Sequence, residues 1–231
     1  MRNLRKFTNE EKFLAWRKST ECVTPNLVLV GAYIKYNVPT LYGVSIQHID
    51  GTLYTISEWQ ENGFTSDDAN GVAIVDERAS FVVAKEDISE KLLWSNEAIL
   101  VEGVSVAPNN INYDFANCMN GVQDTQILVE LGVSPAASAC AEYTFPNGSK
   151  GYLPAVGEWD VFMSYEASAK EAFNLIGGAD LFSPSWAKYY WSTTQENASS
   201  VWVYASRMGI QRQGKNTLTE YTGNTRAFCT L

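Results

Sequence analysis

The order of apolar patterns along the chain is the feature that most constrains its fold. The strongest helical pattern runs from Glu158 to Ile176, where apolar side chains recur on one stripe, and Gly177-Gly178 ends the run. Shorter helical patterns cover residues 124–131 and 136–143. Runs of β-type composition stand before and after these helices, at residues 41–46, 71–75, 80–84 and 201–206. Strands, then helices, then strands predict an α+β fold.

The last of these runs has a strict alternation. Val201, Val203 and Ala205 belong to one face of the predicted strand, and Trp202 and Tyr204 belong to the other. Alternation of this kind is typical of an antiparallel strand that is buried on one face and open to solvent on the other. We therefore expect one face of residues 201–206 to be exposed.

Composition excludes several classes of protein. The chain has 231 residues and a formal net charge of −9, which argues against nucleic acid as a partner. It contains no apolar run of roughly 18 residues or more, so membrane insertion is not expected. Aromatic residues reach 13% while charged residues are only 19%, which favours a β-rich or loop-rich body with wide aromatic surfaces.

The first part of the chain differs from the rest. Residues 1–18 hold six basic and two acidic residues, a balance of +4 on an acidic chain. Thr8 and Glu11 form a capping box that predicts a short helix, and residues 27–36 predict a strand. Asn37-Val38-Pro39 then marks a boundary. We expect an anchoring or oligomerising arm at residues 1–36 and a body at 41–231. A solvated helix face is an alternative explanation for the basic charges.

Residues that carry chemistry are scarce. With the single histidine His48, neither a histidine-rich metal site nor a histidine-based triad is expected, and His48 is predicted to be structural or at the surface. The four cysteines show no metal-binding spacing; they are Cys22, Cys118, Cys140 and Cys229. Free thiols are expected, with a Cys118–Cys140 bridge as an alternative. The chain is therefore predicted not to be an enzyme and to need no metal or cofactor.

Three segments near the C-terminus resemble a known family. Residues 151–159 contain Gly-Tyr-Leu-Pro-Ala-Val-Gly-Glu-Trp, residues 190–194 contain Tyr-Trp-Ser-Thr-Thr, and residues 226–228 contain Arg-Ala-Phe. Their order and spacing resemble the "GYLPxxGEW", "YWSST" and "VRAF" signatures of C-type-lectin-like domains in bacterial surface proteins and tailed-phage virion proteins. The resemblance implies a C-type-lectin-like fold for residues 41–231, although residues 41–146 match it more loosely.

The N-terminal segment resembles a second group. Lys6-Phe7-Thr8-Asn9-Glu10-Glu11 is similar to the leaders of phage fibre and head-decoration proteins. Charges at Glu10, Glu11 and Lys12 stand where a secretory signal needs its apolar stretch, so no export by that route is expected. Together the resemblances imply a virion protein, a head or tail fibre or receptor-binding component. It would be assembled in the host cytoplasm and act outside the cell.

The same resemblances imply partners. The body is expected to bind a bacterial surface glycan or protein non-covalently, while residues 1–36 contact other virion proteins and the chain forms a homotrimer. Some members of the family are targets of diversity-generating retroelements, and residues 196–221 are compatible with that layout. The alternatives are a bacterial adhesin-like module, a decoration protein that binds nothing, and an enzyme of the formylglycine-generating type, which uses paired cysteines. Only Cys229 lies near the region expected for that enzyme.

The binding surface is predicted on the last strands and their loops. Sugar-binding C-type lectins place a carboxamide or carboxylate before Pro-Asn, and Phe145-Pro146-Asn147 lacks it, so no obligatory calcium is expected. Residues 186–231 hold five basic and two acidic side chains, which would attract an anionic glycan. Trp191 and Trp202 are expected in the core. The candidate ligand-binding residues are flat aromatic or hydrogen-bonding side chains: Trp186, Tyr189, Tyr204, Arg207, Gln211, Gln213, Asn216 and Tyr221.

Overall fold

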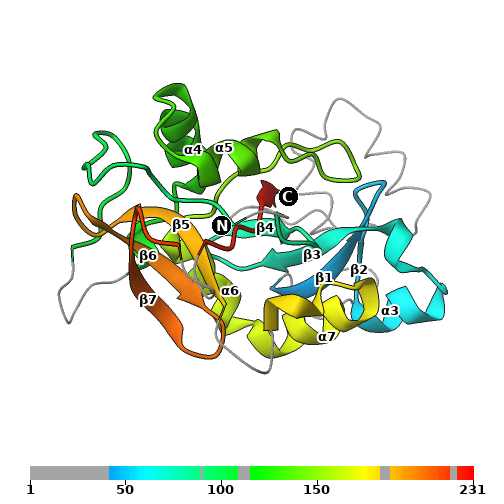
Figure 1. Cartoon of the computed structure of the whole chain (residues 1–231). Coiled ribbons are helices and arrows are strands. Elements are labelled where there is room, and N and C mark those ends of the chain that lie inside the picture. The colour runs from blue at the N-terminus through cyan, green and yellow to red at the C-terminus, as the bar shows by residue number, and fades with distance from the viewer. Residues whose placement is uncertain (1–41, 89–90, 109–114, 183–187, 219–222) are drawn as a thin grey trace, which may run out of the picture. The chain divides into compact units, whose positions relative to one another are not determined.

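A computed structural model describes residues 42–88, 91–108, 115–182, 188–218 and 223–231 (Figure 1). The chain divides into two units, residues 1–43 and residues 44–231. The helix and strand predicted within residues 1–36 lie outside the described residues. The second unit is the body that carries the C-terminal motifs.

Two sheets organise the body. The larger has five strands in the order β2-β1-β3-β4-β8, so the last strand of the chain lies beside β4. Its strands are β1 Gly43–His48, β2 Leu53–Tyr54, β3 Ala69–Val75, β4 Ser80–Val83 and β8 Phe228–Thr230. The pairs β1–β2, β3–β4 and β4–β8 are antiparallel. The strand pair predicted at 71–75 and 80–84 is thereby confirmed, with its turn at residues 76–79.

The smaller sheet has three antiparallel strands in the order β5-β6-β7. They are β5 Tyr189–Gln195, β6 Ser200–Ala205 and β7 Gly209–Gly214. With helices between the two groups of strands, the molecule is a mixed α and β protein with antiparallel sheets, which confirms the predicted α+β class.

The helices lie between β4 and β5 in the sequence, apart from α3 Ile56–Glu61. They are α4 Gly121–Glu130, α5 Pro135–Glu142, α6 Val156–Ser164 and α7 Glu166–Ile176. Single-turn 3₁₀ helices occur at Ser66–Asp68, Phe115–Asn117 and Ala179–Phe182. The helices predicted at 124–131 and 136–143 are present. Ser134 caps α5 by accepting a hydrogen bond from the Ala137 N–H, and Pro135 occupies its first turn.

The single helix predicted from Glu158 to Ile176 is wrong in one respect, because two helices meet at Tyr165. This residue has φ −115° and ψ 11°, which interrupts the helical backbone. Its hydroxyl donates a 2.8 Å hydrogen bond to Asp76 in the β3–β4 turn. The stop at Gly177 is confirmed, since its φ of 91° is the left-handed conformation that favours glycine.

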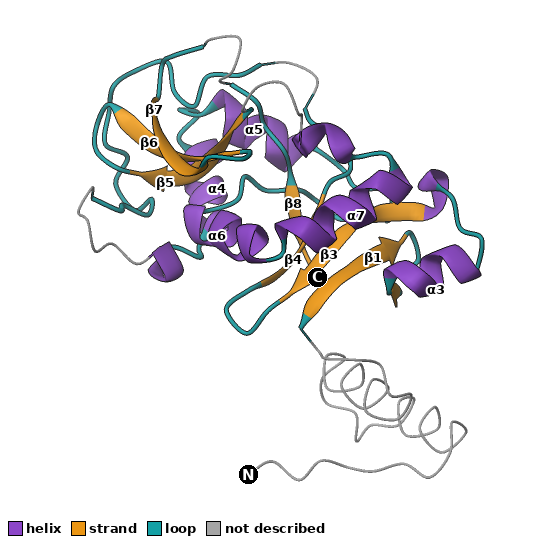
Figure 2. Cartoon of the chain, turned by 90° about the horizontal axis from the view of Figure 1, so that it is seen from below, coloured by secondary structure: helices purple, strands orange, loops and turns teal. Residues whose placement is uncertain are grey.

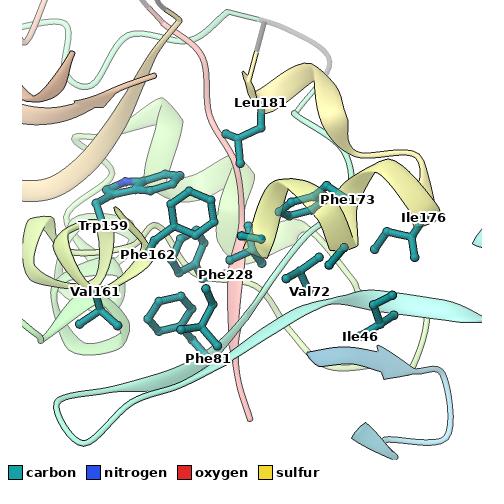
Figure 3. Close-up of a cluster of buried hydrophobic side chains, with 14 of the residues drawn as sticks. Ile46, Val72, Phe81, Trp159, Val161, Phe162, Phe173, Ile176, Leu181 and Phe228 are labelled. Atoms are coloured by element: carbon teal, nitrogen blue, oxygen red, sulfur yellow. The ribbon is translucent and has the colours of Figure 1, made fainter. Parts of the chain in front are cut away.

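The core lies where α7 covers the larger sheet and α6 packs against the smaller sheet. Helix α7 runs along β3 (Figure 2) and contributes Phe173 and Ile176. Helix α6 contributes Trp159 and Phe162, which lie close to Phe228 of β8 (Figure 3). Each of these side chains is buried, and burying one aromatic or large aliphatic side chain stabilises the fold by roughly 1.5–3 kcal/mol.

Strand β6 departs from its prediction. Residues 201–205 are all buried, so neither face of the strand is exposed. Tyr204 packs against Trp159 of α6 on one face. Val201 and Val203 join a second core cluster with Trp94 on the other face. The alternation therefore separates two buried environments instead of a core from solvent.

Candidate functional site

The three C-terminal motif segments meet in one buried network. The Tyr152 N–H donates to the Phe228 carbonyl at 2.7 Å, and the Phe228 N–H donates back to the Tyr152 carbonyl at 3.0 Å. The Trp159 indole N–H donates to the Trp191 carbonyl at 3.2 Å. Segments far apart in the sequence are thus joined by main-chain and side-chain bonds. As predicted, Trp191 belongs to the core, and so does Trp202.

Glu158 is the polar centre of the first motif. It is the third residue of α6, and its carboxylate accepts hydrogen bonds from the Ala155 N–H at 2.6 Å and the Tyr152 hydroxyl at 2.7 Å. Burial raises the pKa of Glu158 to about 7, and these hydrogen bonds oppose the rise. Gly121 lies against the same carboxylate, because a Cβ atom there would meet Glu158 Oε2 at 2.2 Å. The motif glutamate therefore acts as a helix cap inside the core.

Arg226 of the third motif is completely buried and bonds to the segments that follow β4 and α7. Its Nε donates to Asp87 Oδ1 at 2.6 Å, and its guanidinium also reaches main-chain carbonyls at Ala84 and Gly178. The other carboxylate oxygen of Asp87 accepts from the Tyr190 hydroxyl and from Lys188, both at 3.0 Å. A buried guanidinium needs such a partner, since an unpaired charge in the core is costly.

Pairing changes the electrostatic expectation for this end of the chain. Besides Lys188 and Arg226, Arg212 pairs with Glu196 at 2.9 Å. Lys215 is buried, donates to Gln195 Oε1 at 2.7 Å, and has a pKa lowered to about 8 by burial. Four of the five basic side chains counted from the sequence, Lys188, Arg212, Lys215 and Arg226, are therefore paired or buried. Part of the positive balance that the sequence assigns to residues 186–231 is offset by Asp87, which lies outside that range.

The predicted ligand-binding residues divide into three groups. Tyr189, Gln211 and Gln213 are half-buried, whereas Arg207 and Asn216 are exposed; these five form the candidate binding surface. Tyr204 is completely buried, so the expectation that its ring faces outward is corrected. Trp186 and Tyr221 lie outside the described residues. The reason for the Tyr204 error is that α6 covers the face on which its ring lies.

Register places members of the candidate binding surface on one face of the smaller sheet. Tyr189 pairs with Ala205, Gln211 with Val203, and Gln213 with Val201, so all three lie on the face of the second core cluster, where each stays half-buried. Tyr189 and Gln211 also share Met208 as a neighbour. The Tyr189 hydroxyl lies 3.6 Å from the Met208 sulfur, and Gln211 Nε2 donates to the Met208 carbonyl at 2.9 Å.

The β6–β7 turn presents Arg207 in an uncommon conformation. The Met208 N–H donates to the Ala205 carbonyl at 2.9 Å, which closes a four-residue turn around Ser206 and Arg207. Arg207 has φ 71°, in the left-handed region that glycine or asparagine favours. A bulky residue in this conformation costs about 1–2 kcal/mol, and such strain concentrates at functional sites.

Sequence reasoning missed several residues of this region. Strand β7 was not predicted, because Gln211, Arg212 and Gln213 have little β-propensity. Met208 is 54% exposed at the turn and was not singled out. The signal that could have found β7 is the pair of glycines that bound it, Gly209 and Gly214.

The cysteine thiols and the histidine, which catalysis or metal binding would use, are buried or mostly buried in the described residues. Cys118, Cys140 and Cys229 are buried thiols outside any disulfide, so the alternative of a Cys118–Cys140 bridge is wrong, and Cys22 lies outside the described residues. Burial raises the pKa of Cys229 to about 12. The His48 side chain is 17% exposed and lies among aromatic rings, with Phe64 at 5.0 Å between ring centroids.

Among the described residues, no group of three or more histidine, cysteine or acidic side chains is placed to hold a metal ion. None of the helices within the described ranges has the length and apolar character needed to cross a membrane. Comparison with family models, with curated proteins and with solved structures finds no match to this chain.

Proposed function

We propose that the chain is a tailed-phage virion protein whose body, residues 41–231, has a C-type-lectin-like fold and recognises a bacterial surface ligand without catalysis. One observation carries the proposal. The segments that resemble the family signatures converge in the core, where Tyr152 bonds to Phe228 and Trp159 to Trp191. If the three short segments matched the signatures only by chance, they would have no reason to contact one another in the core.

Recognition is assigned to the candidate binding surface. Tyr189, Gln211 and Gln213 lie on one face of the smaller sheet, close to the strained turn at Arg207. An aromatic ring with adjacent amide groups suits non-covalent binding, because each amide both donates and accepts hydrogen bonds. Residues 1–36 would attach the body to other virion proteins and support a homotrimer.

The observations support an adhesin-like module as an alternative, but they oppose an enzyme of the formylglycine-generating type. An adhesin-like module of a bacterial surface would use the same body, so the observations above favour it equally, and the arm would distinguish it. An enzyme of the formylglycine-generating type needs an accessible thiolate. Burial of Cys229 and its pKa of about 12 oppose that role.

The proposal is tested by attachment to bacterial cells. The fluorescently labelled full chain is added to intact cells of a panel of Gram-negative and Gram-positive species. We expect saturable attachment to a subset of the panel, with competition by unlabelled chain. Attachment that is uniform and does not saturate, or is absent throughout, would contradict the proposed recognition. Light scattering of the same sample tests the trimer, whose mass would be three times 25.6 kDa.

A further inference from the structure

In the part of the chain that the structure describes, strand β7 has no neighbouring strand at its outer edge. It is the outer strand in the order β5-β6-β7 (Figure 1), and its six residues are half-buried or exposed. An edge of this kind presents unpaired main-chain donors and acceptors in a row. The inference below rests on the proposed function, since this edge borders the candidate binding surface.

Hydrogen bonds at the β6–β7 turn show which residues of β6 face β7. The Ala205 carbonyl accepts from the Met208 N–H, on the β7 side, at 2.9 Å. The Ser206 N–H donates to the Lys188 carbonyl, on the β5 side, at 3.0 Å. Successive residues of a strand direct their main-chain groups to opposite sides. Residues 201, 203 and 205 of β6 therefore hydrogen-bond toward β7.

The register then identifies the outward groups of β7. Gly209, Gln211 and Gln213 pair with those three residues and direct their main-chain groups toward β6. Ile210 and Arg212 must direct their N–H and C=O groups away from the sheet. Within the described part of the chain, no residue beyond β7 hydrogen-bonds to these groups of Ile210 or Arg212.

The opposite edge of the same sheet is covered. Three outward N–H groups of β5 donate to crossing segments at 2.9–3.2 Å: Trp191 to Asn224, Thr193 to Pro154, and Gln195 to Ser105. The outer edge of β8 in the larger sheet is also bonded, through Tyr152 and Phe228. The open edge of β7 thus contrasts with the edges that this chain does cover.

The usual protections of an open edge are missing from β7. It contains neither proline nor lysine, and its pairing with β6 shows no register shift. Its one charged side chain, Arg212, is tied to Glu196 at 2.9 Å. The charge of the guanidinium is therefore offset by a carboxylate in the β5–β6 turn.

We propose that β7 accepts an extended polypeptide segment as an additional strand, so that the ligand class of the candidate binding surface is protein. A peptide strand supplies C=O and N–H groups in the alternating order that the Ile210 and Arg212 groups require. A glycan has no such repeating pair of groups. A second copy of this chain is a poorer occupant of this edge, because antiparallel pairing of two β7 strands across Arg212 would bring two like charges together.

The critical variant is Arg212→Pro, with Arg212→Ala as its matched control. Both substitutions remove the ion pair with Glu196, but only proline removes the outward N–H and places a ring at the edge. The β6–β7 hydrogen bonds remain, because the Arg212 N–H does not point to β6. Circular dichroism and thermal unfolding establish that both variants keep the fold.

The probe is a displayed library of random ten-residue peptides, selected on the full chain. We expect enriched peptides whose affinity falls about tenfold or more in Arg212→Pro and changes by less than about threefold in Arg212→Ala. A second readout needs no variant: in the wild-type chain, the amide protons of Ile210 and Arg212 should exchange fast alone and slowly with an enriched peptide.

Three outcomes would overturn the inference. They are a lack of enriched peptides, equal affinity for the two variants, and exchange protection confined to other residues. Self-association that Arg212→Pro abolishes would assign the edge to a second copy instead. In all of these cases the chain can still attach to cells, for example through a glycan. Failure of the peptide-strand proposal is therefore distinguishable from failure of the proposed function, which the cell-attachment experiment tests.

Discussion

The buried ion pair between Arg226 and Asp87 gives a sharp test of the structural role assigned to the third motif. Two cations share the Asp87 carboxylate: Arg226, whose side chain is 0% exposed, and Lys188, which is 29% exposed. Removing one partner of a buried pair costs about 3–5 kcal/mol, whereas an exposed pair contributes about 0–1 kcal/mol. The same carboxylate therefore provides both the test and its control.

We expect Arg226→Met to lower the free energy of unfolding by about 3 kcal/mol, the low end of that range, because Asp87 keeps Lys188 and Tyr190 as partners. Lys188→Met should lower it by less than about 1 kcal/mol. Urea denaturation measures both, and with a slope of about 2–3 kcal/mol per molar the Arg226 variant shifts its midpoint by roughly 1 M or more. Equal losses in the two variants would refute the argument.

Three further predictions concern single residues. Because burial raises the pKa of Glu158 from 4.5 to about 7, the contribution of Glu158 to stability should be complete below pH 4.5 and should fall by about 3 kcal/mol as pH rises through 7. Thermal unfolding across that pH range should show a smaller decline in Glu158→Gln, and an equal decline would contradict the assignment. Arg207→Gly should raise the free energy of unfolding by about 0.5–1 kcal/mol by relieving the left-handed backbone, and a loss in urea denaturation would count against strain at this turn. Cys229 should resist iodoacetamide in the native chain at mildly alkaline pH and react once unfolded, as mass spectrometry can show; native labelling would contradict its burial.

Local patterns predicted most elements of the body but not their surroundings. The strand pair at β3–β4 and helices α4 and α5 follow from periodicity and from turn residues nearby in the sequence. The break at Tyr165 could not be predicted in this way, since it accompanies a hydrogen bond to Asp76, which lies 89 residues earlier. Tertiary contacts of this kind override helical periodicity.

In the candidate site, too, local patterns predicted some features, while contacts between distant residues decided the others. The sequence correctly placed Trp191 and Trp202 in the core, yet it put Tyr204 on the surface, because alternation alone cannot tell solvent from a second buried layer. The positive balance predicted for residues 186–231 also left out acidic partners from other parts of the chain. Asp87 is 139 residues from Arg226, so that pairing has no local signal. Local patterns also cannot predict that the edge of β7 is open, because segments distant in the sequence cover the edge of β5 and leave that of β7.

The central claim, that the candidate binding surface recognises a bacterial ligand, is tested most directly by cell attachment of two matched double variants. Gln211→Ala with Gln213→Ala alters that surface, while Gln123→Ala with Gln126→Ala removes two exposed glutamines from α4. The account predicts that the first variant attaches at least about tenfold more weakly than wild type, as expected for two lost hydrogen bonds, while the second attaches normally. Equal attachment by both variants would contradict it.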